Sequence, residues 1–128
     1  MRLILGLFLF ITAAEAQVDI VFDLDWTLVY SVDESFKADA RTIQVEGKFY
    51  RLADGAEDVI AALNSSPDFR VSFFSGGEKS RNHKLLKQIF LPNSNKSLYE
   101  ISHKILSKED LAIHSTDPEA AFTTRYKK

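Results

Sequence analysis

Asp23 and Asp25 stand one residue apart, where an apolar run of the sequence opens into a more polar segment. Two carboxylates this close repel each other, and burying them without partners would be costly. A divalent cation removes the conflict, and a hard, oxygen-rich site favours Mg²⁺. A carboxylate can also attack phosphorus to form an aspartyl-phosphate, while its neighbour protonates the leaving oxygen and later activates water. The pair therefore indicates metal-dependent phosphoryl transfer; loop acids that form caps or salt bridges are the alternative.

Other catalytic chemistries find little support in the residue types. The chain has no cysteine, which excludes thiol nucleophiles, disulfides and thiolate metal sites. The three histidines, His83, His103 and His114, show no ligand spacing such as H-E-x-x-H. Ser75 lacks the glycine two residues before it that a nucleophile elbow has, so acyl transfer is disfavoured.

The elements that must position these residues alternate between strands and helices. Short runs of apolar, β-branched and aromatic residues are typical of buried strands of a parallel sheet, covered on both faces. Apolar residues three and four positions apart indicate helices, and Asp54 can cap the first of them. This order predicts an α/β fold with a parallel sheet. The expected strands are residues 18–22, 71–74 and 101–106, and the expected helices are residues 56–63 and 78–90, with a short segment over 107–113.

The acids and a Ser-Gly-Gly segment occupy equivalent places in this scheme. Ligands of parallel sheets bind beyond the carboxyl ends of the strands. Asp23 and Asp25 follow the first expected strand, and Ser75-Gly76-Gly77 follows the second, so both segments should contribute to one site. Between them, residues 31–39 predict a polar loop, and residues 41–52 predict a β-hairpin that turns at Glu46-Gly47.

The N-terminus has the order of an export signal. Arg2 precedes an apolar run over residues 3–11, and Ala14-Glu15-Ala16 supplies a small-x-small cleavage site. The run is shorter than the about 20 apolar residues that span a bilayer. We therefore expect residues 1–16 to be a signal peptide, and the mature chain from Gln17 to be exported (periplasmic or extracellular) without a stable membrane anchor. A buried first helix or strand of the domain is the alternative.

Size and charge fit one globular domain without a basic footprint. The chain has 128 residues, of which 45% are hydrophobic and 27% charged, with a net charge of −2. Lysine and arginine are scattered, apart from a group on one expected helix that we interpret as a solvated face, so nucleic-acid binding is not indicated. This group consists of Lys79, Arg81, Lys84 and Lys87.

Two stretches carry a resemblance to a known family. Residues 21–29, Val-Phe-Asp-Leu-Asp-Trp-Thr-Leu-Val, place D-x-D-x-T after an apolar strand, and residues 71–75 form an apolar strand that ends in serine. They resemble the first and second motifs of the haloacid dehalogenase superfamily, in the branch of NIF-like, or small C-terminal-domain, phosphatases. The resemblance implies a Rossmann-like parallel sheet flanked by helices, a small β-hairpin flap over residues 41–52 and no large cap domain.

Carried over position by position, the resemblance makes Asp23 the nucleophile and a ligand of Mg²⁺, the expected cofactor. Asp25 becomes the general acid and base, with its backbone carbonyl on the metal. Thr27 would support the loop at the phosphate site. Ser75 and the backbone amides near Gly76 would bind the phosphoryl oxygens, helped by the N-terminus of the following helix.

The remaining two motifs of the family fall in the last part of the chain. The third is a lysine that balances the charge of the phosphoryl group; Lys128 is the expected residue and Lys104 the fallback, with a solvated basic tail as the alternative. The fourth, an apolar strand ending in paired acids, has no match after Leu106. Residues 17–128 thus resemble a phosphatase domain that is incomplete at its C-terminus. We expect an exported phosphomonoesterase for a phosphorylated substrate of undetermined class, or a non-catalytic binding or structural module.

Overall fold

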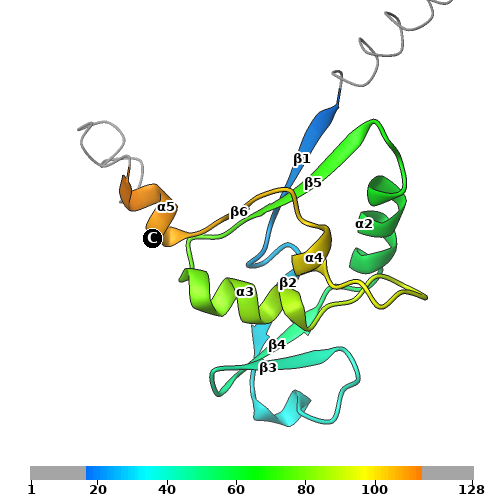
Figure 1. Ribbon diagram of the computed structural model, residues 1–128. Helices are drawn as coiled ribbons and strands as arrows, with labels where there is room; N and C mark the ends of the chain where they lie inside the picture. The colour runs from blue at the N-terminus through cyan, green and yellow to red at the C-terminus, as the bar shows by residue number, and fades with distance from the viewer. Residues whose placement is uncertain (1–16, 114–128) are drawn as a thin grey trace, which may run out of the picture.

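The computed structural model describes residues 17–113, which form an α/β fold around a parallel sheet (Figure 1). The sheet has three strands in the order β1-β5-β6. β1 and β5 pair in parallel with Asp23 opposite Phe74, so the residues after both strands emerge at the same edge. This confirms the prediction of an α/β fold with a parallel sheet. The strands are β1 (Val18–Asp23), β5 (Phe69–Phe74) and β6 (Ile105–Leu106).

The two long strands of this sheet differ in burial. In β5, Val71 and Phe73 are 2% and 0% exposed, as expected of a strand covered on both faces. β1 is an edge strand among the described residues, and Val18 and Val21 are each more than half exposed. The prediction that residues 18–22 are covered on both faces is therefore wrong for this part of the chain. Within β1, only Ile20 and Phe22 are partly buried.

A small antiparallel sheet follows β1 and forms a flap below the parallel sheet (Figure 1). The predicted hairpin is confirmed, and its Glu46-Gly47 turn has positive φ at both residues (53° and 78°), as a type I′ turn requires. The predicted loop over residues 31–39 is partly wrong, because its beginning belongs to a strand that pairs with the hairpin. The sheet consists of β2 (Val29–Val32), β4 (Lys48–Leu52) and β3 (Thr42–Val45), with the 3₁₀ helix η1 (Glu34–Phe36) between β2 and β3.

The helices agree with the sequence in order but differ in detail. The predicted third strand is shorter than expected, because it begins at Ile105 and the expected first residue, Ile101, ends a helical turn. Ser97 caps this turn by accepting a hydrogen bond from the Glu100 amide (3.2 Å). Asp54 does not cap the first helix; Gly55 does, and the Asp54 carboxylate pairs with Arg41 and Arg51 of the flap. The helices are α2 (Ala56–Asn64), α3 (Lys79–Lys87), α4 (Leu98–Ile101) and α5 (Lys108–Ile113).

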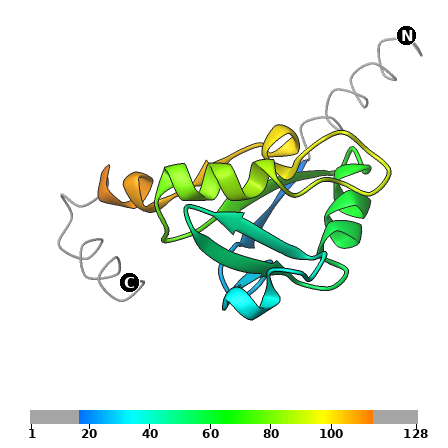
Figure 2. The same ribbon diagram turned by 90° about the horizontal axis from the view of Figure 1, so that it is seen from below.

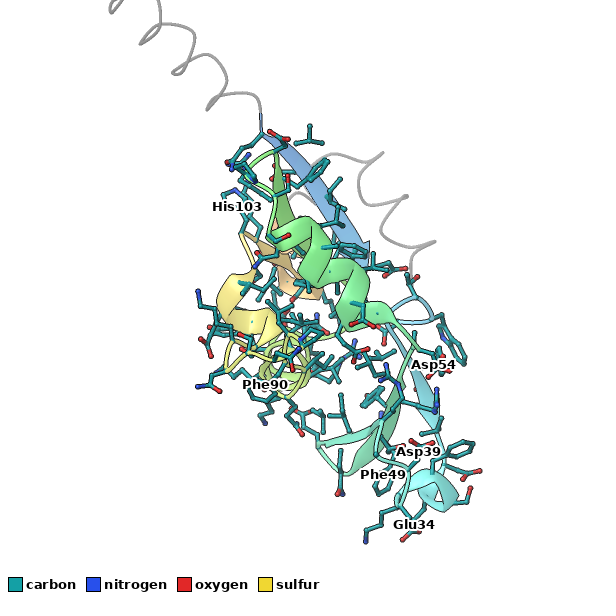
Figure 3. All side chains as sticks on the ribbon, turned by 90° about the vertical axis from the view of Figure 1, so that its right-hand side faces the viewer. Glu34, Asp39, Phe49, Asp54, Phe90 and His103 are labelled. Carbon is teal, nitrogen blue, oxygen red and sulfur yellow. The ribbon has the colours of Figure 1, made fainter. Side chains whose placement is uncertain are left out.

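A single core joins the two sheets. α3 packs against α4 and against β3 of the flap, while α2 packs against β5 (Figure 2). Figure 3 shows the length of this arrangement, with His103 near the start of β1 and Glu34 at the far end of the flap. No helix among residues 17–113 is long and apolar enough to cross a bilayer. The predicted signal peptide lies outside the described residues. The core consists mainly of Leu24, Leu28, Val29, Ile60, Phe73, Leu85, Leu86 and Leu98.

Candidate active site

The loop after β1 holds Asp23 and Asp25 at the carboxyl edge of the sheet. Leu24 between them is fully buried, and its amide donates to the carbonyl of Phe74 on β5 (2.9 Å). The loop then folds back, with the amides of Leu28 and Val29 both donating to the Leu24 carbonyl (3.0 Å each). With Leu24 fixed in the core, Asp23 is left exposed and Asp25 half-buried.

Trp26, the next residue, has an unusual backbone conformation. Its φ of 66° lies in the left-handed region, which is a rare choice for a bulky residue. Its side chain is 76% exposed and stacks on Tyr30 of β2, with ring centroids 6.5 Å apart. Such local strain concentrates at functional loops, where the surrounding structure determines it.

Asp25 is held by three hydrogen bonds from α3 and from the end of β5. Arg81 donates to both carboxylate oxygens (2.8 and 2.7 Å), and the Ser75 hydroxyl donates to Oδ2 (2.6 Å). The hydrogen bond from Arg81 is the largest of the effects that lower the pKa of Asp25; burial opposes it, and Ser75 adds to it. Asp25 in turn raises the pKa of Arg81. The carboxyl group is therefore ionised in this structure over the usual pH range.

Ser75 and the glycines after it form the second half of the site. The Ser75 side chain is fully buried, and its hydroxyl accepts from the Gly77 amide (3.0 Å) and from Arg81 Nη2 (2.9 Å). The buried Asn82 fixes this loop, because its Nδ2 donates to the Gly77 carbonyl (3.1 Å) and to Ser107 Oγ (2.9 Å). The structure thus brings the two predicted segments together.

Two cavities meet at Asp25. The larger, about 660 Å³, lies beside the nucleophile expected from the sequence. The smaller, about 390 Å³, lies toward the flap, and Asp25 and Gly77 line both. The larger cavity is lined by Asp23, Asp25, Trp26, Phe74, Gly76, Gly77 and Lys108. The smaller one includes Ser31, Glu46, Lys48, Tyr50, Glu78 and Arg81.

Lys108 is a site residue that the sequence analysis missed. It begins α5, directly after the short strand β6, and its amide donates to the Gly77 carbonyl (3.0 Å). It lines the same cavity as Asp23 and Asp25 and so brings a cation to the two acids. A signal existed, since a lysine followed by an acid, Lys108-Glu109, comes two residues after the end of the third strand.

The other predicted phosphate-binding residues are placed elsewhere. Lys104 precedes β6 and lies beside β5, where its carbonyl accepts from the Phe73 amide (2.9 Å), and it is not among the residues that line the cavity of Asp23. Thr27 lines a different cavity, about 290 Å³, with Phe22 and Leu28. The support that Thr27 would give the loop stays a prediction, and Lys128 lies outside the described residues.

The residues that could hold Mg²⁺ are the Asp23 carboxylate and the Asp25 backbone carbonyl. Within residues 17–113 there is no group of three or more His, Cys, Asp or Glu side chains that could hold a metal ion. Mg²⁺ commonly takes one or two carboxylates and completes its shell with water and substrate phosphate, so two protein oxygens are compatible with it. The carboxylate of Asp25 is occupied by Arg81 and Ser75.

No protein-family model, no curated protein and no solved structure matches this chain. Because a fold by itself does not specify an activity, the function rests on the chemistry of this site.

Proposed function

We propose that this chain is an exported, Mg²⁺-dependent phosphohydrolase of the haloacid dehalogenase type, which hydrolyses a phosphate monoester through an aspartyl-phosphate on Asp23. The observation that carries the proposal is one cavity, at the carboxyl edge of a parallel sheet, lined by Asp23, Asp25 and Lys108. Ser75 lies next to it, hydrogen-bonded to Asp25. The residues proposed as nucleophile, acid/base and cation thus line one cavity, and phosphoryl transfer needs such a set.

The chemistry divides among these residues. A carboxylate oxygen of Asp23 attacks phosphorus, and the bond from phosphorus to the leaving oxygen breaks while that oxygen takes a proton from Asp25. Water, activated by Asp25, then attacks phosphorus and breaks the bond to Asp23. Lys108 and the Ser75 hydroxyl stabilise the negative oxygens. Mg²⁺, held by Asp23 and the Asp25 carbonyl, would supply further charge neutralisation.

One observation favours the second candidate, a binding module without turnover. Asp25 would have to donate a proton in the reaction, but here it is paired with Arg81, which lowers its pKa and favours its ionised form. In addition, the part of the chain that the structure describes supplies no third acid at the metal. A protein with these features could bind a phosphorylated ligand through Ser75 and Lys108 and leave it unchanged.

Hydrolysis of p-nitrophenyl phosphate by the purified chain separates the two candidates. The phosphatase requires release of nitrophenolate that depends on Mg²⁺, stops in EDTA and is lost in Asp23→Asn. Asp19→Asn is the matched control, because Asp19 lies on the same strand and forms an exposed pair with Arg70. Equal rates for the wild type and Asp23→Asn would contradict the phosphatase.

A further inference from the structure

Arg81 lies at this site, but the proposed mechanism gives it no role. Its side chain is only 12% exposed, lines the smaller cavity and is paired with Asp25, which lines both cavities. The guanidinium carbon is 5.5 Å from the centre of the Tyr50 ring in the flap. Arg81 therefore links α3, the flap and the loop after β1.

The Asp25 carboxylate occupies a place that suits a phosphoryl group. Three donor contacts converge on its two oxygens, one from Ser75 Oγ (2.6 Å) and two from Arg81 (2.8 and 2.7 Å). A guanidinium fork binds paired oxygens of carboxylates and of phosphates in the same planar, bidentate geometry. Asp25 thus occupies donors that an incoming phosphate dianion could use.

Gly77 makes room for this arrangement. A Cβ at position 77 would lie 2.1 Å from Arg81 Nη2 and 2.9 Å from its Cζ. Gly77 is not among the glycines with positive φ, so its backbone conformation does not itself require glycine. A side chain at position 77 would instead displace the Arg81 guanidinium from its place against the Ser75-Gly76-Gly77 loop. Glycine at this position therefore leaves room for Arg81 to reach Asp25.

We propose that Arg81 is a phosphate-binding residue, which rests on Asp25 in the free protein and transfers its fork to the phosphoryl oxygens when a phosphate monoester binds. The inference rests on the proposed function and deepens it. The fork leaves the Asp25 carboxylate only when there is a phosphoryl group to bind, so phosphate takes the place of Asp25 on Arg81.

Calorimetric titration with inorganic phosphate in EDTA tests the inference without metal or turnover. Arg81→Gln should weaken phosphate binding about ten- to a hundredfold, the value of a lost charged hydrogen-bond pair. Arg81→Lys keeps the charge but loses the fork, and should fall between. Arg70→Gln is the matched control, because it breaks the Arg–Asp pair at the opposite end of β1 and β5, and it should retain wild-type affinity.

Removing Arg81 also leaves the charge of Asp25 unpaired, which by itself repels phosphate. The decisive variants therefore carry Asp25→Asn. This single change should tighten phosphate binding, because the competing carboxylate is gone. Adding Arg81→Gln to it should still weaken binding at least about tenfold. A double variant with the same affinity as Asp25→Asn would overturn the inference and leave Arg81 as a partner of Asp25 alone.

The titration also separates this inference from the proposed function. Phosphate binding with the predicted dependence on Arg81 supports the inference even where nitrophenyl phosphate is not hydrolysed. A wild-type protein that hydrolyses the ester but binds phosphate as tightly as Arg81→Gln overturns the inference and keeps the phosphatase. Failure of the wild type to bind phosphate overturns the inference as well.

Discussion

Replacing Asp25 by asparagine should destabilise the metal-free protein at neutral pH and remove part of its sensitivity to acid. The substitution leaves the Arg81 guanidinium, which is 12% exposed, without its counter-charge. Breaking a fully buried pair costs about 3–5 kcal/mol, whereas an exposed pair contributes about 0–1 kcal/mol. Because the Asp25 side chain is 37% exposed, solvent screens the pair. We therefore expect a loss of about 1–2 kcal/mol at pH 7.

The dependence on pH has a definite sign. Hydrogen bonds, foremost from Arg81, hold the pKa of Asp25 below its ordinary value in the folded protein. A group of this kind contributes its stability above the unfolded pKa of about 4, and that contribution is lost as the pH falls through the lower folded value. The gap between wild type and Asp25→Asn should therefore be widest at neutral pH and close in acid, where a protonated Asp25 resembles asparagine.

Urea denaturation in EDTA, at pH values from 7 down to 3, measures this gap. Asp19→Asn serves as the control, since its partner Arg70 is exposed and the pair should contribute little at any pH. A gap between wild type and Asp25→Asn that stays constant over the range would refute the reasoning, because it would mean that the pairing with Arg81 does not control the protonation of Asp25.

Three further predictions concern other parts of the protein. Lys108→Ala should lower kcat/KM for nitrophenyl phosphate about a hundredfold, the usual effect of losing one group that stabilises negative charge in the transition state. Lys104→Ala, which removes a lysine that does not line this cavity, should match the wild type. Ser97→Ala should reduce the free energy of unfolding by about 1 kcal/mol in urea, because its hydroxyl caps α4. If residues 1–16 are an export signal, mass spectrometry of protein secreted by an expressing cell should find Gln17 as the first residue; secreted protein that starts at Met1 would contradict the signal.

The centre of the site could be predicted because it depends on local sequence. A short apolar run followed by acids gives a strand that ends at Asp23, and a second such run ends before Ser75. Parallel pairing with Asp23 opposite Phe74 then places both ends at one edge. The hairpin was also predictable, since its turn residues determine its geometry.

Arg81 and Lys108 could not be identified from the same kind of signal. Arg81 lies in a basic group that we interpreted as a solvated face; the interpretation is wrong for Arg81, because the third position of α3 turns toward the loop. Its partner Asp25 is 56 positions away in the sequence, so only the fold brings the charges together. Lys108 follows a strand of two residues, which is too short to show any periodicity.

The contact between Arg81 and Asp25 also links phosphate binding to metal binding. From sequence alone, the repulsion between Asp23 and Asp25 indicated a bound divalent cation. In the structure, the guanidinium of Arg81 is the cation that pairs with Asp25. If phosphate draws Arg81 away, the unpaired Asp25 carboxylate increases the negative charge beside Asp23 and should strengthen the binding of Mg²⁺. Linkage requires that Mg²⁺ strengthen phosphate binding by the same factor. Calorimetric titrations of each ligand in the presence of the other measure this factor, which should be smaller in Arg81→Gln than in the wild type; equal factors would mean that any coupling passes through direct contact of metal and phosphate, with no part for Arg81.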